Sequence, residues 1–171
     1  MPFLKTLIVT IVVQGTVTVV VPFLLLSSGL NLFAVRFGNF RLLGLLPLAA
    51  GILIYLWCAW GFAFVGRGTP LPVDPPKTLV VRGLYRYIRN PMYVGIFLIL
   101  IGESVFFESA LLFIYSVLVL TAFNLFVFFY EEPVLTKKFG DSYTQYCRRV
   151  PRWIPRFLES NNGDANGKEQ R

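Results

Sequence analysis

Histidine is absent from the sequence, and cysteine occurs only twice among its 171 residues. Without histidine, the chain cannot build a Ser–His–Asp triad, a histidine proton shuttle or a histidine-ligated metal site. Two cysteines are too few for a secreted disulfide scaffold, which relies on several bridges. We therefore predict neither a disulfide framework nor a bound metal.

Charged residues are also scarce. Asp, Glu, Lys and Arg make up 15% of the chain, against about 25% in a soluble domain. Hydrophobic residues account for 56% and aromatic residues for 16%, and the mean hydropathy is +0.65. This much apolar surface excludes a disordered chain, except over the turn-rich tail of residues 160–171. The composition predicts a small protein that crosses a membrane several times.

Four hydrophobic segments are candidates for membrane spans. A spanning helix needs about 20 mainly apolar residues, and it satisfies its own backbone hydrogen bonds in lipid. The predicted spans are residues 4–26, 42–65, 91–107 and 110–130. The third is short, so it spans with the help of tilt or of its neighbours. The first is longer than the apolar core of a signal peptide, about 7–15 residues, so we expect it to be retained.

These segments predict an all-α, polytopic fold with about four transmembrane helices. Polar residues at 102–104 and 108–109 separate the last two spans, which we expect to form a tight hairpin. Residues 1–159 are predicted to be one membrane-embedded domain, with a polar insert between two hydrophobic hairpins and a polar cap after them. The tail of 160–171 is predicted to be disordered.

The distribution of positive charge predicts the orientation. With four spans, fourteen of the sixteen Lys and Arg residues lie on the side of the two termini, and only Arg36 and Arg41 lie opposite. Because cytoplasmic loops carry the excess of Lys and Arg, both termini are predicted to be cytoplasmic, in the plasma or inner membrane. Topology and anionic lipid account for the net charge of +7. We expect no nucleic-acid partner, since no recognised binding module accompanies the charge.

The polar insert has two parts. Four prolines within residues 66–76 forbid a regular helix and favour an extended segment. Further along, Asn90 can cap the third span with Pro91 at its first position. Arginines and tyrosines crowd that helix N-terminus, which suits an anion-binding site. Ordinary positive-inside residues with an interfacial aromatic belt explain them equally well.

Two carboxylates follow the fourth span, in the sequence Glu131-Glu132-Pro133. At a helix C-terminus they would oppose the macrodipole, and beside lipid they need a positively charged partner. This favours a functional site over the alternative, in which Pro133 opens a new helix that welcomes the charges.

The polar cap of residues 139–156 has its own local signals. Asp141 can cap a short helix, and Tyr143 and Tyr146 share one face of it. Pro151 is expected to end this helix. Trp153, flanked by arginines, is typical of an interfacial anchor.

Three motifs together resemble a known superfamily of membrane enzymes, the isoprenylcysteine carboxyl methyltransferases and phospholipid N-methyltransferases, and especially its small bacterial members. The motifs are Gly83-x-Tyr85-Arg86-Tyr87-x-Arg89-Asn90-Pro91-x-Tyr93-x-Gly95, then Glu131-Glu132-Pro133, then Phe139-Gly140-x-x-Tyr143-x-x-Tyr146-x-x-x-Val150-Pro151-x-Trp153-x-Pro155. The resemblance covers about half of the chain and reaches the first two spans only as hydrophobic helices.

The resemblance implies an integral membrane enzyme that uses S-adenosylmethionine and binds it on the cytosolic side. Its cofactor-binding residues would be Tyr85, Arg89, Asn90, Pro91, Tyr93, Gly95, Glu131 and Glu132. Many members have histidine where this chain has Asn90, so any role that needs a titrating imidazole is lost.

Methyl transfer can proceed without histidine, because positioning at an activated sulfonium methyl supplies much of the catalysis. Arg89 could bind the donor's carboxylate, and Glu131 or Glu132 could bind its ammonium or ribose hydroxyls. A carboxylate acceptor needs no base, whereas an amine acceptor would need a glutamate of raised pKa.

The catalytic candidates are therefore Glu131 and Glu132, with Arg148 or Arg152, beside Arg149, to orient an anionic acceptor. We expect the acceptor to be a lipid or a small apolar molecule that enters from the membrane lipids. A phospholipid amine, a lipid carboxylate and a thiol all suit. The alternatives are an NADPH-dependent reductase related to the sterol reductases and a non-enzymatic membrane scaffold.

Overall fold

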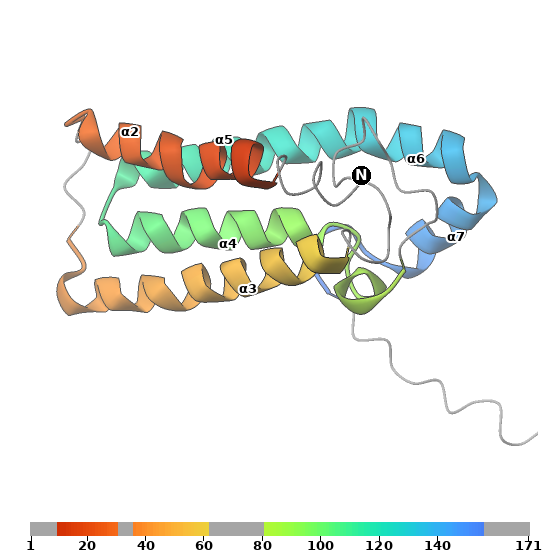
Figure 1. Cartoon of the computed structure of the whole chain (residues 1–171), viewed down its shortest axis with the longest axis horizontal. Helices are drawn as coiled ribbons and strands as arrows, with labels where there is room; N and C mark the ends of the chain where they lie inside the picture. Colours follow the sequence, from red (N-terminus) through yellow and green to blue (C-terminus); the bar gives the residue numbers. More distant parts are fainter. Residues whose placement is uncertain (1–9, 31–35, 62–80, 156–171) are drawn as a thin grey trace, which may run out of the picture.

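The computed structural model describes residues 10–30, 36–61 and 81–155, and all regular secondary structure in these ranges is helical (Figure 1). The all-α prediction is thereby confirmed for the described residues. The Pro-rich segment of 66–76, the tail of 160–171 and the first residues of the predicted first span lie outside them.

The helices join into four longer ones and several short turns. In chain order they are the π-helical η1 (Thr10–Gln14) and η2 (Thr16–Val20), α2 (Val21–Ser27), the 3₁₀ helix η3 (Gly38–Gly44), α3 (Leu45–Gly61), the 3₁₀ helix η5 (Gly83–Arg86), α4 (Pro91–Phe106), α5 (Ala110–Phe126), the π-helical η6 (Val127–Glu131), α6 (Glu132–Phe139) and α7 (Asp141–Arg149). Two continuous helices, Gly38–Gly61 and Ala110–Phe139, are long and apolar enough to cross a membrane. Val12–Ser27 and Pro91–Phe106 are apolar but shorter.

The outward faces of these helices are apolar. Leu53 on α3 is 68% exposed and Phe129 on η6 is 70% exposed. A large exposed apolar surface is typical of a region that contacts lipid or another apolar partner. The structure therefore agrees with a membrane protein, while the number of four spans stays a prediction.

Helices α3 and α4 pack side by side through their glycines (Figure 1). Gly51 of α3 faces Gly95, and Gly44, at the end of η3 where it runs into α3, faces Gly102, so that the η3–α3 helix and α4 each contribute two glycines seven residues apart. A Cβ atom on Gly51 would lie 2.5 Å from the Gly95 carbonyl oxygen. Small residues let two backbones approach this closely, which is the usual way that helices associate in lipid.

The main apolar core lies next to this glycine seam. Tyr55 and Cys58 of α3 pack with Met92, Ile96 and Leu100 of α4, and all five are buried. The core reaches the first turn of α4, so the packing of α3 on α4 also positions the start of α4 in space.

The turn between α4 and α5 is short, as the predicted hairpin requires, and α4 runs through Gly102 without a break. The Ser109 side chain caps α5 by accepting a hydrogen bond from the Leu112 backbone N–H, at 3.3 Å. The Glu108 carboxylate accepts hydrogen bonds from the backbone N–H groups of Phe37 (2.6 Å) and Gly38 (2.9 Å) at the start of η3. This carboxylate therefore connects the turn between α4 and α5 to the start of the helix formed by η3 and α3.

The elements of the polar cap gather at the other end of the bundle (Figure 1). There α3 ends, η5 precedes α4, and α5 continues through η6 into α6. Helix α7 then turns back, and Tyr143, Tyr146 and Val150 form a small second core against α6. The sequence motifs that lie 40 to 60 residues apart therefore meet at one end of the helices.

The facing glycines predict that a Gly-to-Ala substitution, which usually stabilises a helix, destabilises this protein. Ala normally stabilises a helix relative to Gly by about 1 kcal/mol. At Gly51 the added Cβ would clash with the α4 backbone, so we expect Gly51→Ala to lower the free energy of unfolding by about 1–3 kcal/mol. Denaturant unfolding in detergent measures this change. Gly15→Ala is the control, because its Cβ would meet nothing within 4 Å; equal stability of the two variants would contradict the seam.

Candidate functional site

The Glu132 carboxylate lies between two guanidinium groups. Arg152 binds it in a bidentate manner, with Nε 2.9 Å from Oε1 and Nη2 2.8 Å from Oε2. Arg89 Nη1 also donates to Oε1, at 2.8 Å. The side chains of Arg89 and Glu132 are only 13% and 18% exposed, so solvent screens this ion pair weakly. The cluster links the start of α4, the start of α6 and the segment after α7.

Backbone and amide contacts reinforce this link. The Arg89 backbone N–H donates to the Pro151 carbonyl at 2.9 Å, and Asn90 Nδ2 donates to the Arg152 carbonyl at 3.4 Å. Pro91 begins α4 as predicted, because its fixed φ and missing N–H suit the first turn of a helix. Asn90 occupies the N-cap position, but its side chain makes no capping bond. The capping role predicted for it is therefore wrong, and its amide holds the 151–152 segment instead.

The glutamates are presented by a π-helical turn. The helix that begins at Ala110 does not end at Tyr130 but continues through η6 and Pro133 to Phe139. Pro133 has no N–H to donate, and a wider turn is a common way to accommodate such a break in the hydrogen-bond ladder. The prediction of a helix C-terminus here is wrong. Pro133 lies in the first turn of α6, as the alternative expected, but α6 continues directly from η6. Such π turns often occur at functional sites.

Glu131 has a different partner from Glu132. The Tyr93 hydroxyl donates to Glu131 Oε2 at 2.9 Å. The ring of Tyr93 packs against Phe123, with centroids 4.7 Å apart, and lies 6.5 Å from that of Trp153. An aromatic wall therefore borders this carboxylate, and such rings attract cations and stack on planar groups.

Helix α7 covers the site through its aromatic face. Its N-cap is Gly140, with φ of 54°, rather than the predicted Asp141, which lies in the first turn. Tyr143 and Tyr146 share a buried face, as predicted. Burial raises the pKa of Tyr146, although the Arg89 guanidinium opposes the shift. The Tyr146 hydroxyl, which therefore stays protonated, donates to the Tyr85 carbonyl at 2.7 Å.

One polar atom of the cluster has no partner. Within the described part of the chain, Arg89 Nε is buried and makes no hydrogen bond, although Arg89 Nη1 binds Glu132 and the Cys147 sulfur, the latter at 2.9 Å. A buried donor of this kind normally finds an acceptor. The site thus offers a free guanidinium N–H, two carboxylates and an aromatic wall.

Most of the residues that the sequence singled out are brought together, but not all. Arg89, Asn90, Pro91, Tyr93, Glu131, Glu132 and Arg152 gather at the start of α4 and of α6, with Tyr85 close by. Gly95 packs against Gly51 of α3 instead. Arg148 is exposed. It follows the buried Tyr146 by two residues in α7, and residues two apart point to opposite sides of a helix.

Comparison with known proteins gives this geometry its context. Residues 40–142 match the protein family described as phospholipid methyltransferase. The chain belongs to the phospholipid methyltransferase family. The match runs from η3 to the start of α7 and includes both glutamates, Arg89 and Tyr93.

Named relatives of this family member are methyltransferases with different acceptors. The chain is 44% identical over 80 residues to the protein-S-isoprenylcysteine O-methyltransferase of Schizosaccharomyces pombe, an alignment that covers 45% of the chain and 33% of the relative. It is 33% identical over 103 residues to methanethiol S-methyltransferase 2 of Bradyrhizobium diazoefficiens, covering 60% and 38%. It is 32% identical over 77 residues to protein-S-isoprenylcysteine O-methyltransferase B of Arabidopsis thaliana, covering 45% and 39%. The chain thus spans about a third of the length of these curated relatives.

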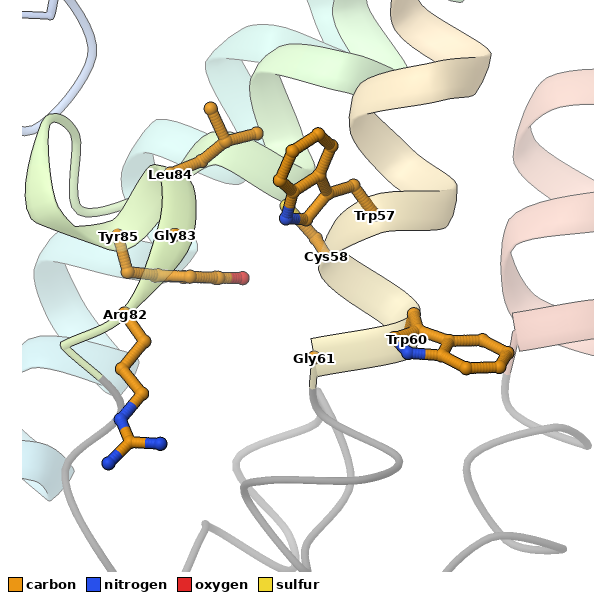
Figure 2. Close-up of a pocket in the computed structure, with 8 residues that line it drawn as sticks. All are labelled: Trp57, Cys58, Trp60, Gly61, Arg82, Gly83, Leu84 and Tyr85. Carbon is orange, nitrogen blue, oxygen red and sulfur yellow. The ribbon is translucent and has the colours of Figure 1, made fainter.

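Sequence reasoning missed a second feature of this phospholipid methyltransferase family member. A pocket of about 210 Å³ lies between the last turn of α3 and η5. Trp57 and Cys58 on one side of it are 24 or more residues from Arg82 on the other (Figure 2), and the sequence assigns Trp57 and Cys58 to no site. Nothing in the sequence pattern indicates that these two segments meet.

The ion-pair cluster predicts how the cap is held. We expect Arg152→Ala to free the segment after α7 and to destabilise it by about 1–3 kcal/mol, the usual worth of hydrogen bonds to charged groups. Amide hydrogen exchange by mass spectrometry should show faster exchange over residues 141–155 and unchanged exchange over α3 and α4. Arg149→Ala is the control, because Arg149 is exposed. Unchanged protection in Arg152→Ala would show that the cluster does not hold the cap.

Proposed function

We propose that this protein transfers a methyl group from S-adenosylmethionine to an apolar acceptor that arrives from the membrane. The observation that carries the proposal is the Arg89, Glu131 and Glu132 constellation at the end of apolar helices, in a chain of the phospholipid methyltransferase family. The relatives named as methyltransferases support the reaction type. The donor and the acceptor are our inference.

The chemistry of the site fits the donor. The unpartnered N–H of Arg89 Nε suits a carboxylate. Glu131, which accepts from Tyr93, retains acceptor capacity for an ammonium or for ribose hydroxyls. The rings of Tyr93 and Trp153 suit a cation or a planar base. A mixed set of one free cationic donor, carboxylate acceptors and aromatic faces matches an amino acid joined to a nucleoside.

The protein's own contribution is positioning. When bound, S-adenosylmethionine supplies a methyl group on a positively charged sulfur, and the bond to sulfur breaks as the acceptor's lone pair forms the new bond. Arg152 holds Glu132 and thereby closes the cap over the site. Arg89 joins the same carboxylate to the start of α4. A rigid, closed cap of this kind excludes water and orients the reactants, an effect worth up to about 7–11 kcal/mol in ideal cases.

The arrangement suits more than one acceptor group. A carboxylate is already ionised at neutral pH, so it needs no base. An amine or a thiol must lose a proton, and Glu131 is the one of the two adjacent glutamates that has no arginine partner among the described residues. Glu131 is therefore our candidate base for those acceptors, and Arg152, which binds Glu132, is our candidate for orienting an anionic one. Arg148 faces away from the cluster, so we give it no part in the reaction.

Calorimetric titration with S-adenosylhomocysteine, with NADPH as the competing ligand, tests the donor. We expect the purified protein to bind the former and not the latter. Arg89→Ala should weaken binding by roughly 10- to 100-fold, the effect of losing a charged hydrogen bond, and Glu131→Gln should weaken it as well. Arg86→Ala is the matched control, because Arg86 is exposed on the adjacent turn. Binding of NADPH alone would turn the assignment to a reductase, and unchanged binding in both variants would place the donor elsewhere.

We propose further that the chain spans the membrane four times with both termini in the cytoplasm, so that the site lies at the cytoplasmic face. The charge bias supports this, since Arg36 and Arg41 are the only positive residues on the other side of a four-span arrangement.

Reporter fusions test this topology. Green fluorescent protein fused after residue 171 should fluoresce, because it folds in the cytoplasm, and alkaline phosphatase fused after Phe40 should be active outside. Phosphatase activity at the C-terminus instead would contradict the orientation and would move the site to the opposite face.

A further inference from the structure

Asn124 is an exposed polar residue on α5, inside a helix that is long and apolar enough to cross a membrane. At 1.5 Å per residue it lies about 21 Å along that helix from Ala110, and it precedes Glu131 by seven residues. A hydrocarbon core is about 30 Å thick. Asn124 therefore lies within the hydrocarbon, in the half nearer the polar cap.

The side chain of Asn124 differs from the other polar side chains of α5. The hydroxyls of Tyr115, Ser116 and Thr121 donate to backbone carbonyls, at 3.0, 2.7 and 2.8 Å. The Asn124 amide makes no hydrogen bond with any residue that the structure describes. It carries two N–H donors and a carbonyl acceptor, and lipid offers neither water nor another partner for them. This amide therefore needs a polar group from outside the described chain.

Asn124 belongs to a line of exposed residues that we call the outer face of α5. The line consists of Ile114, Val117, Thr121 and Asn124. Their spacings of three, four and three residues are those by which one helix packs lengthwise on another. The buried residues of α5, Leu112 and Ser116, lie on its other side, where α4 packs (Figure 1).

The polar cap limits this face at one end. Phe128, four residues after Asn124, lies beneath the Arg152 guanidinium, 5.6 Å from the ring centroid to Cζ. Asn124 is thus the last residue of the outer face before the cap begins. A helix that packs on this face would meet apolar side chains along most of its length and one amide near the cap.

A second copy of the same chain supplies the matching group. Copies that insert in the same direction can pair about a twofold axis along the membrane normal, and each residue then lies at the same depth as its counterpart. On that axis one Asn124 amide meets an identical one, so each Nδ2 can donate to the other Oδ1. A single Asn in a line of heptad spacing is a known determinant of register and of the number of helices. Any other partner would need a polar group of its own at this depth.

We propose that two copies of this protein associate through the outer face of α5, with the Asn124 side chains hydrogen-bonded to each other across a twofold axis. The partner is a second copy in the same membrane. The inference requires that α5 spans the membrane, and it does not depend on the proposed methyl transfer. Because α5 continues through η6 into α6, the pairing also places both Glu132 clusters on the same side of the membrane.

Resonance energy transfer in phosphatidylcholine vesicles tests the association. Donor and acceptor fluorescent proteins are fused after residue 171 of the full chain, and the protein is diluted progressively with lipid. We expect transfer in wild type to exceed the level given by random proximity and to fall along a monomer–dimer curve. Transfer at the random level throughout would show that the chain is monomeric and would overturn the proposal.

Variants at position 124 test the role of the amide. Asn124→Leu should raise the apparent dissociation constant about 3- to 30-fold, the range expected for hydrogen bonds between helices in lipid. Asn124→Gln keeps the amide and should retain most of the association. Ala122→Leu adds apolar bulk at nearly the same depth but off the outer face, and should behave as wild type. Equal association of Asn124→Leu and wild type, or equal loss in the Leu and Gln variants, would contradict the amide pairing.

Disulfide crosslinking in the same vesicles locates the contact. With copper phenanthroline as the oxidant, Thr121→Cys should form a crosslinked dimer. Ala122→Cys lies about 100° further around the helix and should crosslink no more than wild type, which contains Cys58 and Cys147. Crosslinking of Ala122→Cys in preference to Thr121→Cys would place the contact on another face of α5 and would show the proposal to be wrong.

Discussion

The Glu132 carboxylate, held between Arg89 and Arg152, is the interaction on which the polar end of the molecule depends. It joins three segments that are far apart in the sequence and carry little apolar surface of their own. A carboxylate near lipid is costly unless it is paired, and here it is paired twice, once in bidentate geometry. The cap can therefore close over the ends of apolar helices without a large hydrophobic core.

The helices below the cap are held together by a different interaction. In lipid there is little hydrophobic gain in joining two helices, so close backbone packing must supply the attraction. The facing glycines of the η3–α3 helix and of α4 provide it, and the apolar core beside them positions the start of α4. Arg89 and Asn90 immediately precede that point. The position of the ion-pair cluster thus follows from helix packing as well as from charge.

Much of the site could be predicted from the sequence because its residues are chemically conspicuous. Paired glutamates after an apolar run need cations, and arginines at a helix start supply them. The predictions that were wrong concern two positions at which the geometry of the folded backbone overrides a local sequence rule for where helices start and end. Asn90 is in the capping position, but its side-chain oxygen accepts no capping hydrogen bond, and its Nδ2 donates to the Arg152 carbonyl. The helix passes Pro133 because a π turn absorbs the missing hydrogen bond.

The sequence by itself determined the all-helical class, the polar end and the family, because composition, hydrophobic runs and motif spacing are local properties. Only the tertiary structure decided that Arg152 rather than Arg148 joins Glu132, since the segment after α7 folds back to the start of α6 and carries Arg152 to the carboxylate. It alone decided that Gly95 serves helix packing, and that Trp57 and Arg82 share a pocket. Contacts between distant segments depend on how whole helices cross, and no local pattern contains that information.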